Sequence, residues 1–336
     1  MSKQRKLSYL FSALWVAVLF AAIMGAVATG VIGSYYSGIL VLIGINIILA
    51  VSLNLVTGFL GQLVLGHAGF MSVGAYSAAL FTMNSGLPLS AAFPLGLLFG
   101  GLVAAVFGVI IGIPALRLRG DYLAIITLGF GEIIRVLILA VDFTGGAAGL
   151  TGIPRPSGQY TLIAYTFVIA ALTVVAILAF IRSRHGRAVI AIREDEIAAE
   201  ASGINTTYYK LLAFVVAAFF AGVAGGIYAH HVGVLDPSKF DFNYSVEILI
   251  MVVLGGMGSI TGSVCSATVL TLLPEMLRSF SDKRMLIYSL VLIIVMLFKP
   301  SGLLGTHEFS IRKIIGKICD KKQKKQPAGG APGKEA

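Results

Sequence analysis

The feature that most constrains this chain is a series of long apolar segments that recurs along nearly its whole length. A helix needs about 20 apolar residues to cross a bilayer, whose core offers no water to satisfy the backbone. The first segment, residues 9–29, follows basic residues and looks like a signal peptide. Because it is long and lacks a convincing small-residue cleavage site, we expect a retained helix.

Ten such segments predict an all-α polytopic membrane protein with about ten transmembrane helices. The others are 39–56, 67–83, 91–116, 122–141, 160–181, 211–230, 244–254, 263–277 and 285–298. The composition agrees, because only 12% of the residues are charged, against about 25% in soluble domains. Eight spans with re-entrant segments is the alternative, since ten spans leave Arg278, Lys283 and Arg284 in an external loop.

Positive charge is concentrated in three places, residues 1–6, 182–210 and 312–325, and the net charge is +10. The positive-inside rule places all three in the cytoplasm, and ten spans give both termini that side. Topology explains the basic tail better than nucleic acid does, so no nucleic-acid partner is expected. We predict a membrane domain over 1–306 and a basic cytoplasmic tail over 307–336, largely disordered after 320.

The long polar interval over 182–210 separates two apolar segments. Its centre, 193–203 (REDEIAAEASG), predicts a short capped helix. Acidic residues crowd its first turn, where the helix macrodipole favours negative charge, and alanines fill the middle. Gly203 stands where a helix end favours a left-handed residue. We expect this cytoplasmic helix to dock a partner.

Two glycine-rich breaks, 58–74 and 255–262, interrupt the apolar pattern, one in each half of the chain. Irregular backbone at membrane depth must be buried in protein or line a wet cavity, and paired breaks point to a transport site. Tight turns between packed helices explain them equally well. We therefore treat both breaks as glycine-broken segments of a candidate translocation path.

Ionisable residues inside the apolar segments are further candidates for a translocation path. Glu132 and Arg135 are three residues apart and share one helix face. They fit a self-neutralising pair better than the polar wall of a pathway. Glu247 has no partner visible in the sequence. His67, beside glycines, fits a hydrogen-bonded packing residue better than a proton relay.

Neutral polar residues leave two readings open. Asn54, Gln62 and Ser72 fit a polar ligand and a bond across helices equally well. No pair of catalytic groups, phosphate-binding glycine loop or metal-ligand spacing appears in the sequence. We therefore expect no enzymatic activity and no cofactor or metal in this chain, and active transport would draw its energy from a partner.

The polar interval resembles the EAA motif, the helix through which bacterial ABC-importer permeases contact their ATPase. A fuller set of strings is similar to the LivM-type permease of branched-chain amino-acid importers, in the same order from 39 to 305. These strings are GRA (186–188), AIREDEIAAEA (191–201), GIN (203–205), NLVTG (54–58), GQ (61–62), GHA (66–68), TLGFGEIIR (127–135), GLTGIP (149–154), VLGGMG (253–258) and KPSGLLG (299–305).

This resemblance implies a permease subunit that moves leucine, isoleucine and valine across the bacterial inner membrane. Its partners would be a second, LivH-like permease, two ATPase subunits that bind ATP and Mg²⁺, and a periplasmic branched-chain amino-acid-binding protein. That protein would face the external segments 142–159 and 232–243. The ATPase-coupling residues would be Arg193, Glu194, Glu196, Ala198, Ala199, Glu200 and Gly203. The translocation path would include Asn54, Gly58, Phe59, Gln62, His67, Ser72, Glu132, Gly255, Gly256 and Gly258.

Three alternatives stay open from the sequence. Related permeases carry urea, short amides or sugars, and the string around Gln62 favours the amino-acid branch. A stand-alone secondary transporter or channel conflicts with the docking helix and with the lack of coupling-ion carboxylates. A purely structural subunit conflicts with the paired glycine breaks. Copurification with an ATPase separates the importer from the last two.

Overall fold

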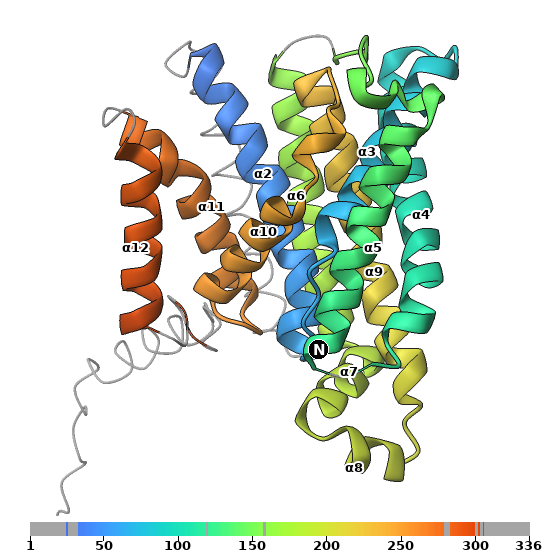
Figure 1. The fold of residues 1–336 in the computed structure, drawn as a ribbon, viewed down its shortest axis with the longest axis vertical. Helices are drawn as coiled ribbons and strands as arrows, with labels where there is room; N and C mark the ends of the chain where they lie inside the picture. Colours follow the sequence, from blue (N-terminus) through green and yellow to red (C-terminus); the bar gives the residue numbers. More distant parts are fainter. Residues whose placement is uncertain are drawn as a thin grey trace, which may run out of the picture.

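The structure is a computed structural model that describes residues 25, 33–118, 120–156, 159–278, 283–299, 302 and 305. Within these ranges the chain folds into helices joined by short turns, which confirms an all-α polytopic membrane protein (Figure 1). Apart from residue 25, the predicted first span lies outside the described residues, and so does the whole tail over 307–336.

Each later predicted span corresponds to one helix whose ends differ from the prediction by a few residues. The α-helices are α2 (Ser34–Asn54), α3 (His67–Asn84), α4 (Leu89–Ala115), α5 (Asp121–Ala140), α6 (Gln159–Arg182), α7 (Arg184–Glu194), α8 (Glu196–Ala201), α9 (Thr206–Val232), α10 (Phe242–Gly255), α11 (Ile260–Met276) and α12 (Arg284–Phe298). The π turn η1 (Leu55–Phe59) continues α2, and the 3-10 turns are η2 (Asp142–Thr144), η3 (Gly146–Ala148) and η4 (Pro237–Lys239).

The helices differ in whether they are long enough to cross a membrane. Among the described residues, five helices are long and apolar enough to cross a membrane: Tyr35–Phe59, Leu89–Ala115, Asp121–Ala140, Tyr160–Arg182 and Thr206–Val232. The 14 residues of α10 rise only about 21 Å, less than the roughly 30 Å of a bilayer core. The count of ten spans therefore stays a prediction.

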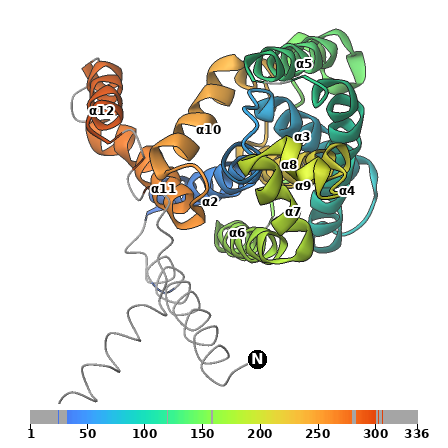
Figure 2. The same cartoon turned by 90° about the horizontal axis from the view of Figure 1, so that it is seen from below.

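Helices α3, α4 and α9 form the most tightly packed part of the bundle, and Figure 2 shows them side by side. Glycines allow this close approach. A Cβ on Gly74 would overlap the backbone of Gly222, and one on Gly225 would overlap the carbonyl oxygen of Met71. In lipid, association of helices relies on such close packing, because the surrounding tails are as apolar as the helix surfaces.

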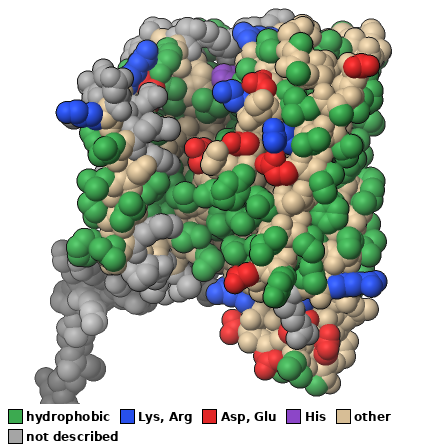
Figure 3. Space-filling view, viewed as in Figure 1, with side chains coloured by type: hydrophobic (Ala, Val, Ile, Leu, Met, Phe, Trp, Pro, Cys, Tyr) green, Lys and Arg blue, Asp and Glu red, His purple; other side chains and the backbone are tan. Residues whose placement is uncertain are grey.

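One end of the molecule carries the polar helices. Figure 1 shows α7 and α8 below the bundle, whereas α11 and α12 stand to one side. Hydrophobic side chains cover much of the middle of the face in Figure 3, and acidic side chains gather at its lower end, over α8. The interval over 182–210 therefore projects from the membrane domain, as the charge pattern predicts.

We expect Gly225→Ala to destabilise the bundle, because the new methyl group meets the backbone of α3 rather than a movable side chain. Overpacking of this kind costs about 1–3 kcal/mol. Thermal unfolding in detergent measures the loss. Gly129→Ala is the matched control, since a Cβ on Gly129 meets nothing within 4 Å; equal stability of the two variants would contradict the prediction.

Candidate functional site

The predicted helix over 193–203 is two helices in the structure. Helix α7 ends at Glu194, and Asp195 has an extended backbone with φ −158°. The Asp195 carboxylate accepts hydrogen bonds from the backbone N–H groups of Ile197 (2.9 Å) and Ala198 (3.0 Å). The prediction of one helix starting at Arg193 is wrong, because this N-cap starts a new helix at 196.

The predicted end of the helix is confirmed. Gly203 follows α8 with φ +82°, in the left-handed region that glycine adopts without steric cost. Its backbone N–H donates to the carbonyl of Glu200 at 2.9 Å. The left-handed turn reverses the chain, so that α9 begins within a few residues of the end of α8.

Two glutamates of α8 hold the helix onto α9. The Glu196 carboxylate lies 2.7 Å from the ammonium of Lys210, whose side chain is only 3% exposed. The Glu200 carboxylate accepts a hydrogen bond of 2.6 Å from the hydroxyl of Thr206. Both partners belong to the start of α9. Glu196 and Glu200 were expected to contact the ATPase. In the structure their carboxylates bind Lys210 and Thr206 of the same chain.

The exposed surface of α8 carries apolar side chains together with the acidic side chain of Glu200. Ile197 is 73% exposed, and Ala198 and Ala201 beside it are also exposed, whereas Ala199 is buried. Sequence reasoning placed Ala198 and Ala199 at the coupling contact but left out Ile197 and the buried Lys210. The exposure of Ile197 could have been inferred from the sequence, because it is an isoleucine among charged residues and alanines. Nothing near Lys210 in the sequence signalled its burial.

The two glycine breaks meet each other and α7 at one point, which we call the glycine junction (Asn54, Gly58, Arg193 and Gly258). The Arg193 guanidinium donates to the carbonyl of Gly58 at 2.6 Å. The Asn54 side-chain oxygen accepts from the backbone N–H of Gly258 at 2.9 Å. A Cβ on Gly58 would overlap both the Asn54 amide oxygen and Gly258 N. The junction is therefore closed to any larger residue at position 58.

Neighbouring residues complete the junction. Phe59 is buried in the π turn that carries Gly58. Gly255 ends α10 and packs against the backbone of Gly262, while Gly256 packs against Gly305, which follows α12. The expected path residues Gly58, Phe59, Gly255, Gly256 and Gly258 are thus brought together, although contact between the two breaks could not be read from the sequence.

Other expected path residues are packing residues. His67 is buried, and its ring lies 2.9 Å from the hydroxyl of Ser52 on α2. Ser72 is buried and donates to the carbonyl of Gly69 at 2.7 Å. Gln62 is half-buried just after the π turn. His67 therefore links α3 to α2, while Ser72 bonds within α3, and both side chains lie away from any open surface.

Glu132 lies in a separate place, beside a cleft between α3, α5 and the start of α10. Its carboxylate pairs with the guanidinium of Arg135 at 2.7 Å, and both side chains are partly exposed. The cleft is narrow and is also lined by Asp241 and Ser245. Charged side chains are visible in the upper half of this face in Figure 3. The predicted pairing is confirmed, and the pair stands at an accessible surface.

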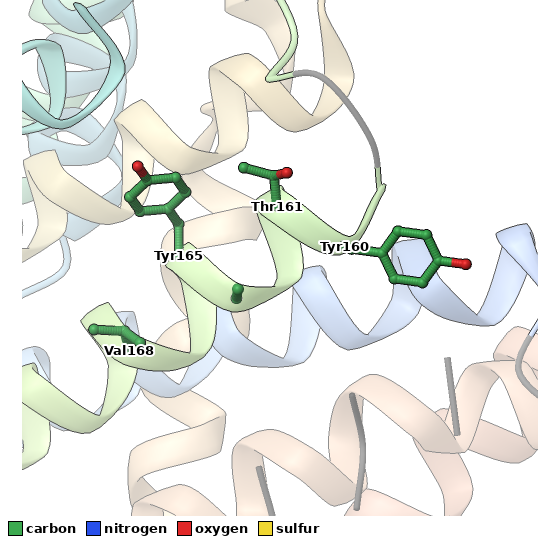
Figure 4. Close-up of a pocket in the computed structure, with 5 residues that line it drawn as sticks. Tyr160, Thr161, Tyr165 and Val168 are labelled. Atoms are coloured by element: carbon green, nitrogen blue, oxygen red, sulfur yellow. The ribbon is translucent and has the colours of Figure 1, made fainter. Parts of the chain in front are cut away.

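A larger, open cavity of about 460 Å³ lies on α6 and is lined by Tyr160, Thr161, Ala164, Tyr165 and Val168. Figure 4 shows the Tyr160 and Tyr165 rings pointing in different directions. The cavity is apolar and lies at the start of α6, whereas α7 and α8 follow the end of that helix. It therefore has no part in the glycine junction. In the described part of the chain, no three His, Cys, Asp or Glu side chains are grouped to hold a metal ion.

The opposite end of the bundle joins the two segments expected to be external. The backbones of Leu150 and Leu235 exchange two hydrogen bonds of 2.9 Å, and the Arg155 side chain binds the carbonyl of Val232. Phe143 nearby is strongly exposed. The described part of the first loop, 142–156, thus contacts the second loop, 232–243.

Residues 35–299 match the model of a family described as the branched-chain amino acid transport system / permease component. The chain belongs to this family. The motif resemblance is thereby confirmed, and the glycine junction and α8 both lie inside the matched region.

Relatives with assigned names support the same family. The chain is 39% identical over 269 residues to the high-affinity branched-chain amino acid transport system permease protein LivM of Salmonella typhimurium and to LivM of Escherichia coli. Each match covers 71% of this chain and 62% of the relative. The protein BraD of Pseudomonas aeruginosa is 32% identical over 175 residues, or 51% of this chain and 55% of the relative. The chain thus spans about three fifths of the length of the LivM proteins that it matches.

We expect Glu196→Gln to loosen α8, because it leaves the buried Lys210 ammonium without its carboxylate. A fully buried pair loses about 3–5 kcal/mol when one partner is removed; partial exposure of Glu196 lowers our expectation to about 1–3 kcal/mol. Hydrogen exchange of the α8 amides measures the effect. Glu194→Gln, at an exposed position two residues earlier, should leave exchange unchanged; faster exchange in both variants would contradict an anchoring role for Glu196.

Proposed function

We propose that this chain is the membrane-spanning permease subunit of an ATP-binding-cassette importer for leucine, isoleucine and valine. The observation that carries the proposal is α8, a short helix that projects below the bundle (Figure 1). Its Ile197 side chain is 73% exposed. Glu196 and Glu200 fix α8 on α9, so the helix presents the Ile197 side chain from a fixed position. Family membership supports transport of branched-chain amino acids.

The proposed assembly contains a second, LivH-like permease, two ATPase subunits and a periplasmic branched-chain amino-acid-binding protein. ATP and Mg²⁺ would bind in the ATPase subunits. The end of the molecule with α8 would face the cytoplasm of a bacterium, with both termini on that side of the inner membrane. The joined loops 142–159 and 232–243 would face the binding protein. The names of the LivM relatives, which place them in a high-affinity transport system, support a multi-component importer.

The division of labour in the permease follows from the placement of its residues. Ile197, Ala198 and Ala201 are exposed on α8 and would enter the ATPase surface. Glu132 is partly exposed at the surface, whereas the other candidate path residues His67 and Ser72 are buried. An aliphatic side chain needs no specific polar partner, whereas the charged groups of an amino acid need a few dipoles. A largely apolar path therefore suits this substrate class.

The function is tested by ATP-dependent uptake of leucine into proteoliposomes that hold the whole predicted complex. We expect Ile197→Asp to abolish uptake and copurification of the ATPase, because a charge replaces the apolar contact at the centre of α8. Ile197→Leu, which keeps an apolar side chain, should behave like wild type. Unfolding in detergent shows whether both variants keep the wild-type stability.

Three outcomes would contradict the proposal. Wild-type leucine uptake without any ATPase would indicate a secondary transporter. ATP-dependent uptake of urea or a short amide, but not of leucine, would indicate another substrate branch. Undiminished copurification of the ATPase with a folded Ile197→Asp chain would show that α8 is not the docking helix.

A further inference from the structure

Helix α8 is connected to the membrane domain by two separate routes. The first leads to α9, through the ion pair of Glu196 with Lys210 and the hydrogen bond of Glu200 with Thr206. The second leads through Asp195 into α7, whose Arg193 reaches the glycine junction. The first route ends on the helix that follows α8 in the chain. The second route reaches backbone more than a hundred residues away.

The contact of Arg193 with Gly58 is well suited to transmit a displacement. Gly58 lies in the π turn at the end of the α2 segment, where carbonyl groups lack partners further along the helix. A cation is favoured at this end of a helix, and a hydrogen bond from a charged donor is stronger than a neutral one. Arg193 also lies close to Gly258, since a Cβ on Gly258 would be 3.0 Å from the same Nη1 atom. One guanidinium therefore binds the first glycine break and lies beside the second.

Asn54 ties the two breaks to each other independently of Arg193. Its side-chain N–H groups donate to the carbonyl of Ser259 (3.0 Å) and the hydroxyl of Ser263 (2.8 Å), while its oxygen accepts from Gly258 N–H. Asn54 is fully buried. This one amide satisfies backbone groups of the turn between α10 and α11 from the end of α2, so the ends of three helices are held together.

We propose that Arg193 is a positioning residue that transmits movement of α8 to both glycine breaks at once, and that Asn54 makes the two breaks move as one unit. The proposal rests on the proposed function and adds the route of coupling inside this chain. Gly58 and Gly258 pack closely against each other, since a Cβ on Gly58 would overlap the backbone nitrogen of Gly258. A shift of α7 therefore displaces the ends of α2, α10 and α11 together. The contacts of Glu196 and Glu200, in contrast, connect α8 only to α9.

The first test compares Arg193→Ala with Arg187→Ala in proteoliposomes that hold the whole complex. Arg187 is an exposed arginine of the same helix α7, and its guanidinium contacts the carbonyl of Arg182. We expect Arg193→Ala to keep the ATPase bound and hydrolysing ATP, while leucine transported per ATP falls about tenfold, within the usual range of coupling energies. Arg193→Lys, which keeps a cationic donor, should restore part of the ratio, and Arg187→Ala should match wild type.

Two results of this test would overturn the inference. If Arg193→Ala transports as much leucine per ATP as wild type, the second route carries no coupling. If Arg193→Ala no longer copurifies with the ATPase, Arg193 belongs to the docking surface. A loss of the ratio in Arg187→Ala as well would show a general effect of charge on α7, which also contradicts a specific role for Arg193.

A second measurement does not depend on the substrate. In a chain with Cys265 and Cys319 replaced by serine, spin labels are placed in pairs at Gln62→Cys, Met257→Cys and Tyr122→Cys, all at least partly exposed positions. On ATP binding we expect the distances from Tyr122 to both other labels to change, while the distance between Gln62 and Met257 stays constant. Arg193→Ala should abolish these changes, and Asn54→Ala should let the Gln62–Met257 distance change.

The spin-label result separates the two proposals. A complex that binds ATP and moves both breaks but carries no leucine refutes the proposed substrate and supports the route through Arg193. Labels that move in Arg193→Ala as they do in wild type refute the route, whatever the substrate is.

Discussion

The backbone of the two glycine breaks leaves the helical hydrogen-bond ladder within a membrane protein, and the protein itself must satisfy the freed polar groups. Asn54 and Arg193 meet this requirement, since they bind the carbonyl of Gly58, the N–H of Gly258 and the carbonyl of Ser259. Packing then excludes any side chain at position 58. The arrangement of α2, α7, α10 and α11 around this point depends on these few contacts.

In the polar interval between α6 and α9, some side chains anchor α8 to the bundle and others remain exposed. Asp195 stops α7 and caps α8, while Glu196 and Glu200 bind α9. These contacts leave Ile197 outward. A motif that looks like one acidic docking surface in the sequence therefore has carboxylates that mostly hold the helix in place. A fixed helix loses less conformational entropy on binding than a mobile one, so anchoring favours a firm contact with a partner.

Much of the fold and part of the site followed from local pattern. The apolar segments predicted each helix from α2 onward within a few residues, except α7 and α8, and Gly203 adopted the left-handed turn that a helix end favours. The pair of Glu132 and Arg135 also formed as their spacing indicated. The split at Asp195 was missed, because an aspartate suits both a first helical turn and an N-cap, and helix propensity alone does not choose between them.

The sequence by itself determined the membrane class, the order of the helices and the family, because hydrophobic length and local motifs are properties of neighbouring residues. Only the tertiary structure decided that Glu196 faces a buried lysine, that the partner of His67 is Ser52, and that the two breaks share one junction with Arg193. Asn54 and Gly258 are about two hundred residues apart in the chain. Their contact depends on helices that pack only after the chain has folded, so no local pattern encodes it.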